Sequence, residues 1–451
     1  MNNAFRFLLS IFTVILIAPT GVTADNRAST DDDAAALVFD HPLTLVELTD
    51  LALRRNAKTR LAWAAIRSSE AGVELARAGY WPQVDAIVSA QRNRALNFSG
   101  LPSDIQSRYG ASVSLSYLLW DFGTRSGQLD QAKYELVSAS LSQDQTVQDV
   151  ILQVEAAYYQ VLGLQAVVEA NRQSLSDAET NLAATQDRKK SGLATLGDVY
   201  TTEAALAGIK LALQQAEGQL AVARGQLATA LDASPDTLLP LVVWEQDVAP
   251  ALPPQSVASL LADARRARPE LLAAKAREQA AAANLTATRG RGLPSLNVNA
   301  NAGRTQVVDV TGSSQFSALV SLDVPLFAGF GDRAAVHQAQ AQLDTARAST
   351  DDLRSQVELQ VWQAYQNLRT SIVTLDTSAS QLKSAQLAAE VSNARYKNGL
   401  DTILDVLNAQ TTLANARVQQ VQARLDWAAA RAALGHAVGG LNAPTATMET
   451  P

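Results

Sequence analysis

Four short segments of the chain alternate apolar and polar residues. Each places an apolar side chain at every second position, and the positions between hold mostly serine, asparagine, glycine or glutamine. This alternation is typical of a β-strand with one apolar and one polar face. The sequence therefore predicts four amphipathic strands of roughly ten residues in two separate pairs, at 84–90, 109–119, 296–302 and 316–324.

Longer stretches follow a helical period instead. From Val199 to Ala230 the apolar residues keep a 3-4-3-4 spacing, which is the seam of a coiled coil. From 404 to 434 there are two such seams offset by two residues, so this helix needs packed neighbours on both flanks. The proline-free segment from Thr124 to Lys190 predicts a helix about 100 Å long at 1.5 Å per residue. Long helices with packed flanks suit the wall of a hollow cylinder.

One phrase occurs twice in this helical sequence. KSGLATLGDV begins at Lys190 and KNGLDTILDV begins 207 positions later, at Lys397. At nearly the same offset, FGTR at 122–125 is similar to FGDR at 330–333. Each half of the chain therefore has the order helix, two strands, long helix, hairpin, helix, and the sequence predicts two structural repeats.

Prolines and the N-terminal composition divide the chain. Residues 1–24 combine Arg6, an apolar run and a small-residue cleavage site, which is the pattern of a signal peptide. A proline-rich linker, expected near the equator of the helical wall, separates the two repeats. The predicted divisions are a signal peptide at 1–24, an N-terminal extension at 25–43, a first repeat at 44–231, the linker at 232–255, a second repeat at 256–438 and a tail at 439–451.

Composition narrows the classes of function. The net charge is −7, and Lys and Arg are scattered rather than clustered, so we expect no nucleic-acid partner. The chain has no cysteine, which excludes disulfides, thiol catalysis and sulfur-ligated metals. The three histidines, His41, His337 and His436, are far apart. We therefore expect no metal, no cofactor and no catalytic residue, which argues against a hydrolase or a transferase.

The strands are long enough to cross an outer membrane. Aromatic residues lie near both ends of the segments, as in the girdles of membrane β-barrels. They are Tyr80, Trp81, Trp120 and Phe327 at one end, and Phe98, Tyr109 and Phe316 towards the other. Four strands cannot close a barrel, and an open edge in lipid leaves backbone groups unpaired at several kcal/mol each. We therefore expect a homotrimer with a barrel of about twelve strands.

The repeated phrase itself predicts a helix reversal. Gly192 and Gly399 suit the left-handed position just past a helix end. Thr195 and Thr402 then fit as N-caps of the next helix, each followed three residues later by an aspartate, Asp198 or Asp405, as in a capping box. For Asp198 we expect this capping role alone.

The whole mature chain resembles the TolC-like outer-membrane factor family, and its most specific match is ARYKNGLDTILDVLNAQTTL at 394–413. Members are trimeric channel-tunnels that end tripartite efflux pumps and type I secretion systems. The resemblance implies a trimeric α-helical periplasmic barrel of coiled-coil helices joined to a 12-stranded outer-membrane β-barrel. It also implies a periplasmic adaptor protein, an inner-membrane transporter and outer-membrane lipid as partners.

The same resemblance assigns site residues. Tyr396 matches a tyrosine of the family's closing latch at the periplasmic entrance, and Asp405 matches the first aspartate of an acidic ring. Asp401 stands where the family has an arginine, and Asn408 replaces the second ring aspartate. The hairpin tips, expected to dock the adaptor, comprise Gly192, Leu193, Thr195, Gly399, Leu400 and Thr402.

Two other classes compete with a channel. A periplasmic coiled-coil protein with a structural or adaptor role would explain the heptads but would leave the paired strands unexplained. An enzyme would need a nucleophile with a base, or a metal cluster, which the sequence lacks. The sequence therefore favours a passive, gated conduit of an outer membrane that extends into the periplasm.

Overall fold

The computed structural model describes residues 41–94, 105–242, 250–308 and 312–440. The chain divides into two units, Met1–Asp40 and His41–Pro451, and all of the described residues lie in the second. The predicted signal peptide and most of the predicted N-terminal extension and C-terminal tail lie outside the described residues.

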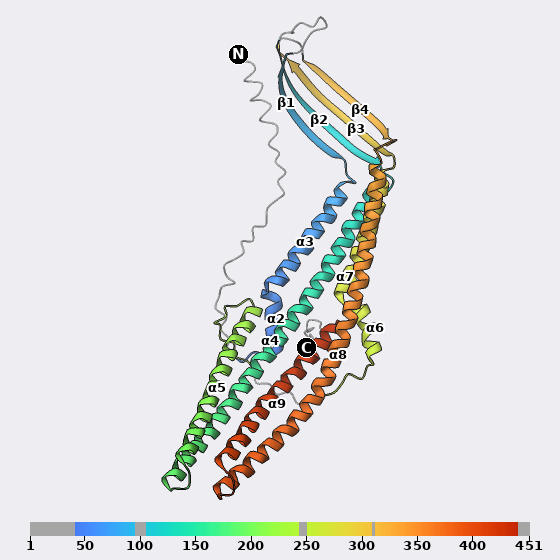
Figure 1. Cartoon of the computed structure of the whole chain (residues 1–451). Helices are drawn as coiled ribbons and strands as arrows, with labels where there is room; N and C mark the ends of the chain where they lie inside the picture. The colour runs from blue at the N-terminus through green and yellow to red at the C-terminus, as the bar shows by residue number, and fades with distance from the viewer. Residues whose placement is uncertain (1–40, 95–104, 243–249, 309–311, 441–451) are drawn as a thin grey trace, which may run out of the picture. The chain divides into compact units, whose positions relative to one another are not determined.

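The described residues form the same order of elements twice (Figure 1). The first set is α2 (Leu45–Arg55), α3 (Ala57–Ala78), β1 (Gln83–Asn93), β2 (Gln106–Trp120), α4 (Thr124–Lys190) and α5 (Leu196–Ala230). The second set is α6 (Val257–Ala267), α7 (Pro269–Arg291), β3 (Ser295–Val307), β4 (Ser313–Asp323), α8 (Gly331–Lys397) and α9 (Ile403–Val438). This confirms the predicted fold class and its two repeats.

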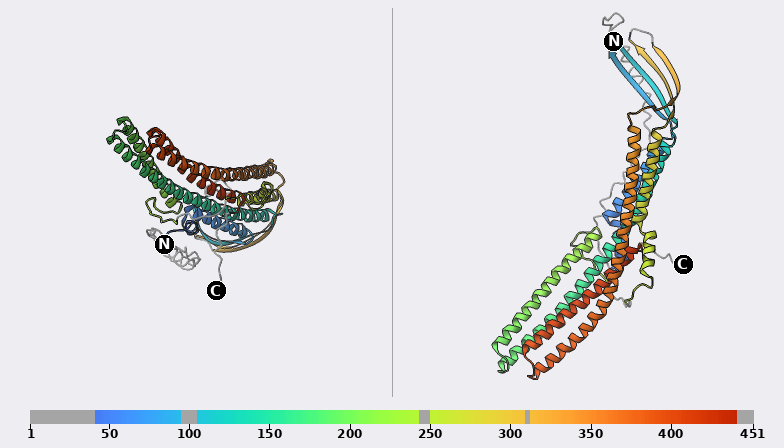
Figure 2. Two further views of the ribbon diagram at one scale, coloured as in Figure 1. Left: turned by 90° about the horizontal axis from the view of Figure 1, so that it is seen from below. Right: turned by 45° about the vertical axis from the view of Figure 1, so that its right-hand side comes forward.

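The helices lie side by side in a curved wall (Figure 2). In the half of the wall away from the sheet, the helices lie next to one another in the order α5, α4, α9, α8. In the half nearer the sheet, the order is α3, α4, α7, α8. Helices α4 and α8 run through both levels, and each has 67 residues, or about 100 Å at 1.5 Å per residue. One edge of the wall is therefore made by α3 and α5, and the other by α8.

The seams predicted from the heptads are the contacts between neighbouring helices. Helix α5 buries Val199, Leu220 and Leu227 from its one seam, against α4. Helix α9 has α8 on one flank and α4 on the other, as its two seams required. Its seam towards α8 includes Leu413 and Ala416, both buried.

The four strands form one antiparallel sheet in the order β1-β2-β3-β4. All four predicted segments are confirmed: β1, β2 and β3 extend beyond the alternation at both ends, and β4 begins three residues earlier and ends one residue earlier than predicted. A single shift of register lies in β2, between Leu118 and Trp120. The sheet therefore has two free edges, β1, which continues from α3, and β4, which leads into α8.

A buried arginine holds the end of α9 in the middle of the wall. Arg268, between α6 and α7, is only 4% exposed, and its Nη1 donates to the carbonyl oxygens of His436 and Ala437 at 3.2 and 3.1 Å. Its guanidinium also contacts Glu270 and, through Nη2, Gln360 Oε1 at 2.7 Å. His436 O also accepts from the N–H of Gly439, the C-cap residue, at 2.9 Å, and these carbonyls belong to the last turn of α9, so Arg268 adds a side-chain cap to this helix end.

Candidate functional site

The two hairpins at the end of the wall away from the sheet reverse the chain in the same way (Figure 1). Gly192 and Gly399 have φ of +72° and +74°, in the left-handed region that glycine adopts without strain. The next residue donates back to the preceding helix: Leu193 N to Arg188 O at 2.8 Å, and Leu400 N to Arg395 O at 2.9 Å. These are Schellman endings. Leu193 and Leu400 are 67% and 68% exposed, so each tip presents one large apolar side chain.

The helices that follow the two hairpins, α5 and α9, both start with a complete capping box. Thr195 Oγ1 accepts from Asp198 N at 3.1 Å, and Asp198 Oδ2 accepts from Thr195 N at 2.7 Å. Thr402 and Asp405 repeat this arrangement, with a further bond from Thr402 Oγ1 to Asp405 Oδ2 at 2.6 Å. The Thr402 hydroxyl, the Thr402 backbone N–H and the charge of Arg395 together lower the pKa of Asp405. Asp405 is exposed and carries a negative charge at neutral pH.

Tyr396 joins the two hairpins to each other. It is 8% exposed and packs against Ile403 and Val406 in a small apolar cluster at the tip of α8 and α9. The guanidinium of Arg188, at the end of α4, lies 4.5 Å from the centroid of its ring. Arg188 Nη1 also donates to the carbonyl oxygens of Tyr396 and Lys397 at 3.2 and 3.4 Å. We call this contact between the hairpins the Arg188 clamp.

Sequence reasoning missed Arg188. It assigned caps and adaptor-docking residues to the first hairpin, and it placed the latch in the second. The available signal was the substitution of the family's arginine by Asp401, which raised the question of where a positive charge near Tyr396 would come from.

The other two predicted gate residues lie close by. Asp401 is paired with Arg395 of the same hairpin, Oδ1 to Nε at 2.9 Å, and its side chain is 17% exposed. Asn408 is exposed, one turn along α9 from Asp405. The structure therefore brings Tyr396, Asp401, Asp405 and Asn408 to one hairpin, with Asp401 held inside an ion pair.

The register of the sheet separates its side chains into two faces. Side chains opposite each other in neighbouring strands point to the same side. One face is largely apolar and includes the row Ala86, Val113, Ala302, Phe316. The other is largely polar and includes the row Asp85, Ser114, Asn301, Ser317. This polar face also carries Ser112, Ser114, Ser116, Asn297, Asn299 and Asn301.

Aromatic residues gather where the sheet meets the helices. Trp81, Trp120 and Phe327 are 72%, 60% and 75% exposed there, and Trp120 stacks edge to face with Phe122. At the other end, Tyr109 lies opposite Ala90, while Phe98 lies outside the described residues. The exposed rings beside the helices fit one interfacial girdle of a membrane barrel.

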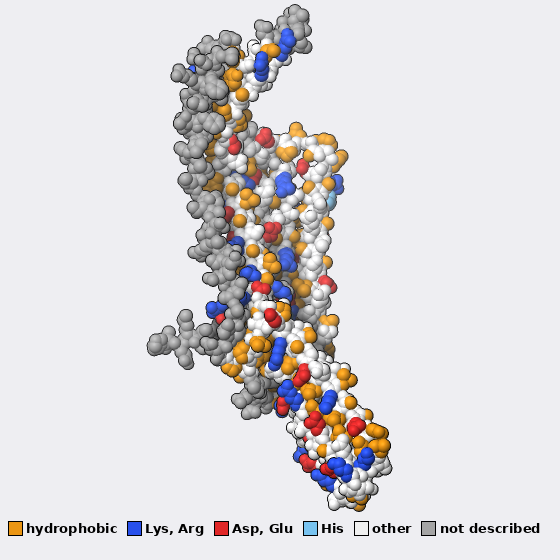
Figure 3. All heavy atoms as spheres, turned by 90° about the vertical axis from the view of Figure 1, so that its left-hand side faces the viewer, with side chains coloured by type: hydrophobic (Ala, Val, Ile, Leu, Met, Phe, Trp, Pro, Cys, Tyr) orange, Lys and Arg blue, Asp and Glu red, His pale blue; other side chains and the backbone are white. Residues whose placement is uncertain are grey.

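Both edges of the helical wall expose apolar stripes. On α8 the stripe lies opposite the seam with α9 and consists of Leu359, Trp362, Val373, Leu387 and Val391. On α5 the stripe lies opposite the seam with α4 and consists of Leu196, Tyr200, Leu211 and Val222. Figure 3, in which the side of the molecule that carries α5 faces the viewer, shows hydrophobic side chains exposed among charged ones. These stripes leave apolar surface that a neighbouring helix could cover.

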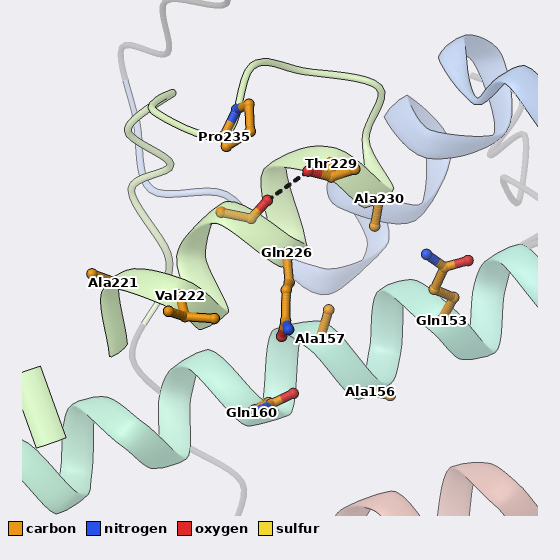
Figure 4. A pocket seen from close by; sticks show the side chains of 11 residues that line it. Gln153, Ala156, Ala157, Gln160, Ala221, Val222, Gln226, Thr229, Ala230 and Pro235 are labelled. Carbon is orange, nitrogen blue, oxygen red and sulfur yellow. Dashed lines mark hydrogen bonds between the residues drawn. The ribbon is translucent and has the colours of Figure 1, made fainter. Parts of the chain in front are cut away.

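One surface groove of the helical wall is lined by uncharged residues. The groove between α4 and α5 is lined by small apolar residues and by Gln153, Gln160 and Gln226, with Pro235 at its rim (Figure 4). Within the described ranges, no group of three or more histidine or acidic residues is arranged to hold a metal ion. The helices of the described part include none long and apolar enough to span a membrane.

Comparison with known proteins identifies the family. The family described as outer membrane efflux protein matches residues 48–233 and 260–440. The chain is 31% identical to Protein CyaE of Bordetella pertussis, over 84% of this chain and 80% of that one. It is 26% identical to outer membrane efflux protein BepC of Brucella suis, over 87% and 84%. The crystal structure of outer membrane protein VceC from Vibrio cholerae shares the fold, with a TM-score of 0.78 at 20% identity over 88% and 96% of the two chains.

The family model covers most of the chain in two consecutive segments, as expected of a duplicated protein. The family comprises channel proteins and not enzymes. The chain therefore belongs to the outer membrane efflux protein family, and it is an outer-membrane channel protein that extends into the periplasm.

Proposed function

We propose that three copies of this chain close into one hollow channel, the exit duct of a tripartite efflux pump or a type I secretion system. The observation that supports this proposal most strongly is that the free edges of the helical wall and of the sheet belong to the same parts of the chain. In both the helical wall and the sheet, one free edge belongs to the first repeat, as α3, α5 and β1, and the other to the end of the second, as α8 and β4.

A head-to-tail ring joins both sets of edges at once. The α8 stripe of one copy covers the α3 and α5 edge of the next, while β4 of that copy pairs with β1 of its neighbour. Such a heterologous contact closes into a ring when the rotation permits. Three copies give about twelve strands, enough for a barrel with a water-filled lumen, whereas one copy leaves unpaired edges in lipid.

The faces of the sheet then have defined surroundings. The apolar face contacts outer-membrane lipid, and the polar face of serine and asparagine lines the lumen. The channel is passive and needs no cofactor. Energy comes from an inner-membrane transporter, which connects to the channel through a periplasmic adaptor.

The hairpins form the gated periplasmic entrance. Three Asp405 side chains, one from each copy, supply an acidic constriction, with Asn408 one turn further along the lumen. At about 6 Å each pair of carboxylates repels by about 0.7 kcal/mol in bulk water, so the closed state is held against its own charge. Tyr396 and the Arg188 clamp supply part of that hold, while Asp401, neutralised by Arg395, contributes less charge to the ring.

Adaptor docking at the hairpin tips opens this entrance. The exposed Leu193 and Leu400 give each tip an apolar contact, and the Gly-Leu turns with their caps, Thr195 and Thr402, hold the tips in shape. An adaptor that binds the separated hairpins more tightly than the closed ones shifts the equilibrium by that difference in binding free energy.

The proposal is tested by fractionation and conductance. We expect trimers in the outer-membrane fraction that dissociate on heating, and ion-conducting pores after reconstitution into planar bilayers. A monomer released by osmotic shock, with no conductance in a bilayer, would contradict the channel and would favour a periplasmic coiled-coil protein.

A further inference from the structure

Two arginines lie on the apolar face of the sheet. Arg304 of β3 is opposite Ala111 of β2, and Arg92 of β1 is opposite Ser107. Ala111 lies two residues before Val113 in β2, on the face that also carries Phe316. The single shift of register lies at the other end of β2, so Arg304 and Arg92 share this apolar face.

Within the described part of the chain, the structure gives neither guanidinium a carboxylate partner, and both side chains are exposed. On the lipid face of a barrel an arginine costs about 2–4 kcal/mol at the midplane but only about 0–1 kcal/mol near an interface. Unpaired arginines on this face therefore need an interfacial position and an anion supplied from outside the chain.

Their height along the sheet gives them such a position. Leu296, where the sheet meets the helices, marks the lower end of the apolar band. Arg304 is eight residues further along β3, about 20 Å higher for strands tilted by about 40°. Arg92 pairs with Ser107, which is in register with residue 308, four positions beyond Arg304, so Arg92 is the higher of the two. The outward apolar band of a barrel is about 25 Å tall, so Arg304 lies just below its outer boundary and Arg92 lies at that boundary or above it.

We propose that Arg304 and Arg92 bind the phosphate groups of the outer-leaflet glycolipid, the phosphorylated diglucosamine of lipopolysaccharide. This inference rests on the proposed barrel, whose apolar face contacts lipid. Both arginines lie towards the end of the strands away from the helices, and since the helices extend into the periplasm, that end faces the outer leaflet (Figure 1).

The chemistry favours a phosphate ligand. A guanidinium presents its N–H donors as a planar fork that matches two phosphate oxygens, and such charge-assisted pairs are stronger than neutral hydrogen bonds. The side chain of Arg304 is long enough to extend from just below the boundary to the phosphate level while its methylenes stay in the apolar layer. The strand β2 separates β1 from β3, so the two guanidiniums lie about 10 Å apart laterally, which allows them to contact separate phosphates.

Arg108 provides a matched control. It lies on the polar face, opposite Gln91 and Val307 and close in height to Arg92, and its Nη2 donates to Gln106 Oε1 at 3.2 Å. Removing its charge changes the lumen and leaves the lipid face unaltered.

The test is lipid binding to the purified detergent-solubilised protein by native mass spectrometry. The probes are diphosphorylated lipid A, the same lipid A after removal of its phosphates, and phosphatidylglycerol. We expect the wild type to retain diphosphorylated lipid A preferentially. The variants Arg304→Gln and Arg92→Gln should each bind it about tenfold more weakly, the loss expected for one charged hydrogen bond. Arg108→Gln should bind it like the wild type.

Three results would overturn the assignment: equal loss in Arg108→Gln, wild-type binding that does not depend on the phosphates, or equal retention of phosphatidylglycerol. Size-exclusion profiles and bilayer conductance of every variant show whether the channel itself has formed. A channel that conducts but does not discriminate the lipids removes only the lipid site, whereas failure of the wild type to form trimers or to conduct removes the proposed function.

Discussion

Single side chains determine how firmly the two hairpins of one chain hold together. The Arg188 clamp combines a cation–π contact, worth about 0.5–2 kcal/mol depending on desolvation, with hydrogen bonds from a charged donor to the carbonyl end of α8. Arg188 is partly exposed, so solvent screening reduces the sum to about 1–2 kcal/mol. The clamp holds the α8–α9 hairpin to the α4–α5 hairpin.

Loss of the clamp should favour the open entrance. We expect Arg188→Ala to raise the open-to-closed ratio about 5- to 30-fold for each of the three copies whose clamp is lost, the factor that corresponds to about 1–2 kcal/mol per copy, as measured by single-channel recording. Lys189→Ala removes the same charge from the adjacent exposed position and should leave the ratio nearly unchanged. Equal gating in the two variants would show that net charge, and not the clamp, controls the entrance.

Because the capping box occurs in both hairpins, its two aspartates can be compared to distinguish a capping role from a pore-lining role. Asp198→Ala and Asp405→Ala remove the same half of two equivalent capping boxes, so both should lower the thermal midpoint by a similar amount. We expect only Asp405→Ala to abolish block of the channel by divalent cations, because only that carboxylate lies in the proposed ring. Block that persists in Asp405→Ala would exclude Asp405 from the ring.

The stability that the Thr402–Asp405 capping box contributes depends on pH through the pKa of Asp405. Hydrogen bonds from Thr402 lower the pKa of Asp405 below 3.8, so the folded state favours the ionised form. Stability from this cap is therefore present above pH 3.8 and is lost as the pH falls through the lowered pKa. Divalent block should disappear over the same range, since protonation discharges the ring. Block that persists at a pH well below 3.8 would assign cation binding to other groups.

At the scale of elements, close approach of helix backbones builds the wall. A Cβ at Gly127 of α4 would lie 2.6 Å from Ala287 N and 2.9 Å from Ala283 O, both backbone atoms of α7. Since a backbone cannot move as a side-chain rotamer can, α4 and α7 pack at this distance only because residue 127 is glycine.

We expect Gly127→Ala to force α4 and α7 apart and to destabilise the protein by about 1–3 kcal/mol, measured as a lower thermal midpoint. Gly72 of α3 is the control, because a Cβ there meets no atom within 4 Å. Gly72→Ala should be neutral or stabilising by up to about 1 kcal/mol, since alanine costs less conformational entropy than glycine in a helix. A midpoint for Gly127→Ala at or above that of the wild type would show that the helices can separate without cost.

At the scale of the whole molecule, the apolar stripes on the outer edges need partners. Val373, 63% exposed, lies on the α8 stripe, whereas Thr374 is about 100° further around the same helix. In the proposed ring only the first of these side chains is covered by the next copy.

Val373→Arg should therefore weaken the trimer, because an unpaired charge in an apolar contact costs several kcal/mol. Thr374→Arg adds the same charge beside the contact and should leave the trimer intact. Native mass spectrometry of the purified proteins measures the fraction of trimer. Intact trimers of Val373→Arg would show that this stripe is not an interface.

Much of the architecture followed from periodicity. The strands were predictable because one face of each is apolar and the other polar, and α5 and α9 because their seams repeat every 3.5 residues over many turns. The helix reversals were predictable because a glycine past one helix end and a threonine three residues later leave few alternatives for the backbone. Strand ends were less certain, since Gln306 and Val307 extend β3 only through pairing with β2.

The amino-acid sequence by itself determined the local elements, the duplication and the family, because these depend on residues close together or repeated at a constant offset. Only the tertiary structure decided which distant side chains meet. Arg188 contacts Tyr396 because the ends of α4 and α8 lie together, and Arg304 lies on the apolar face because of the register between β2 and β3. Such contacts join residues far apart in the chain, and they depend on how whole helices and strands pack, which no local pattern records.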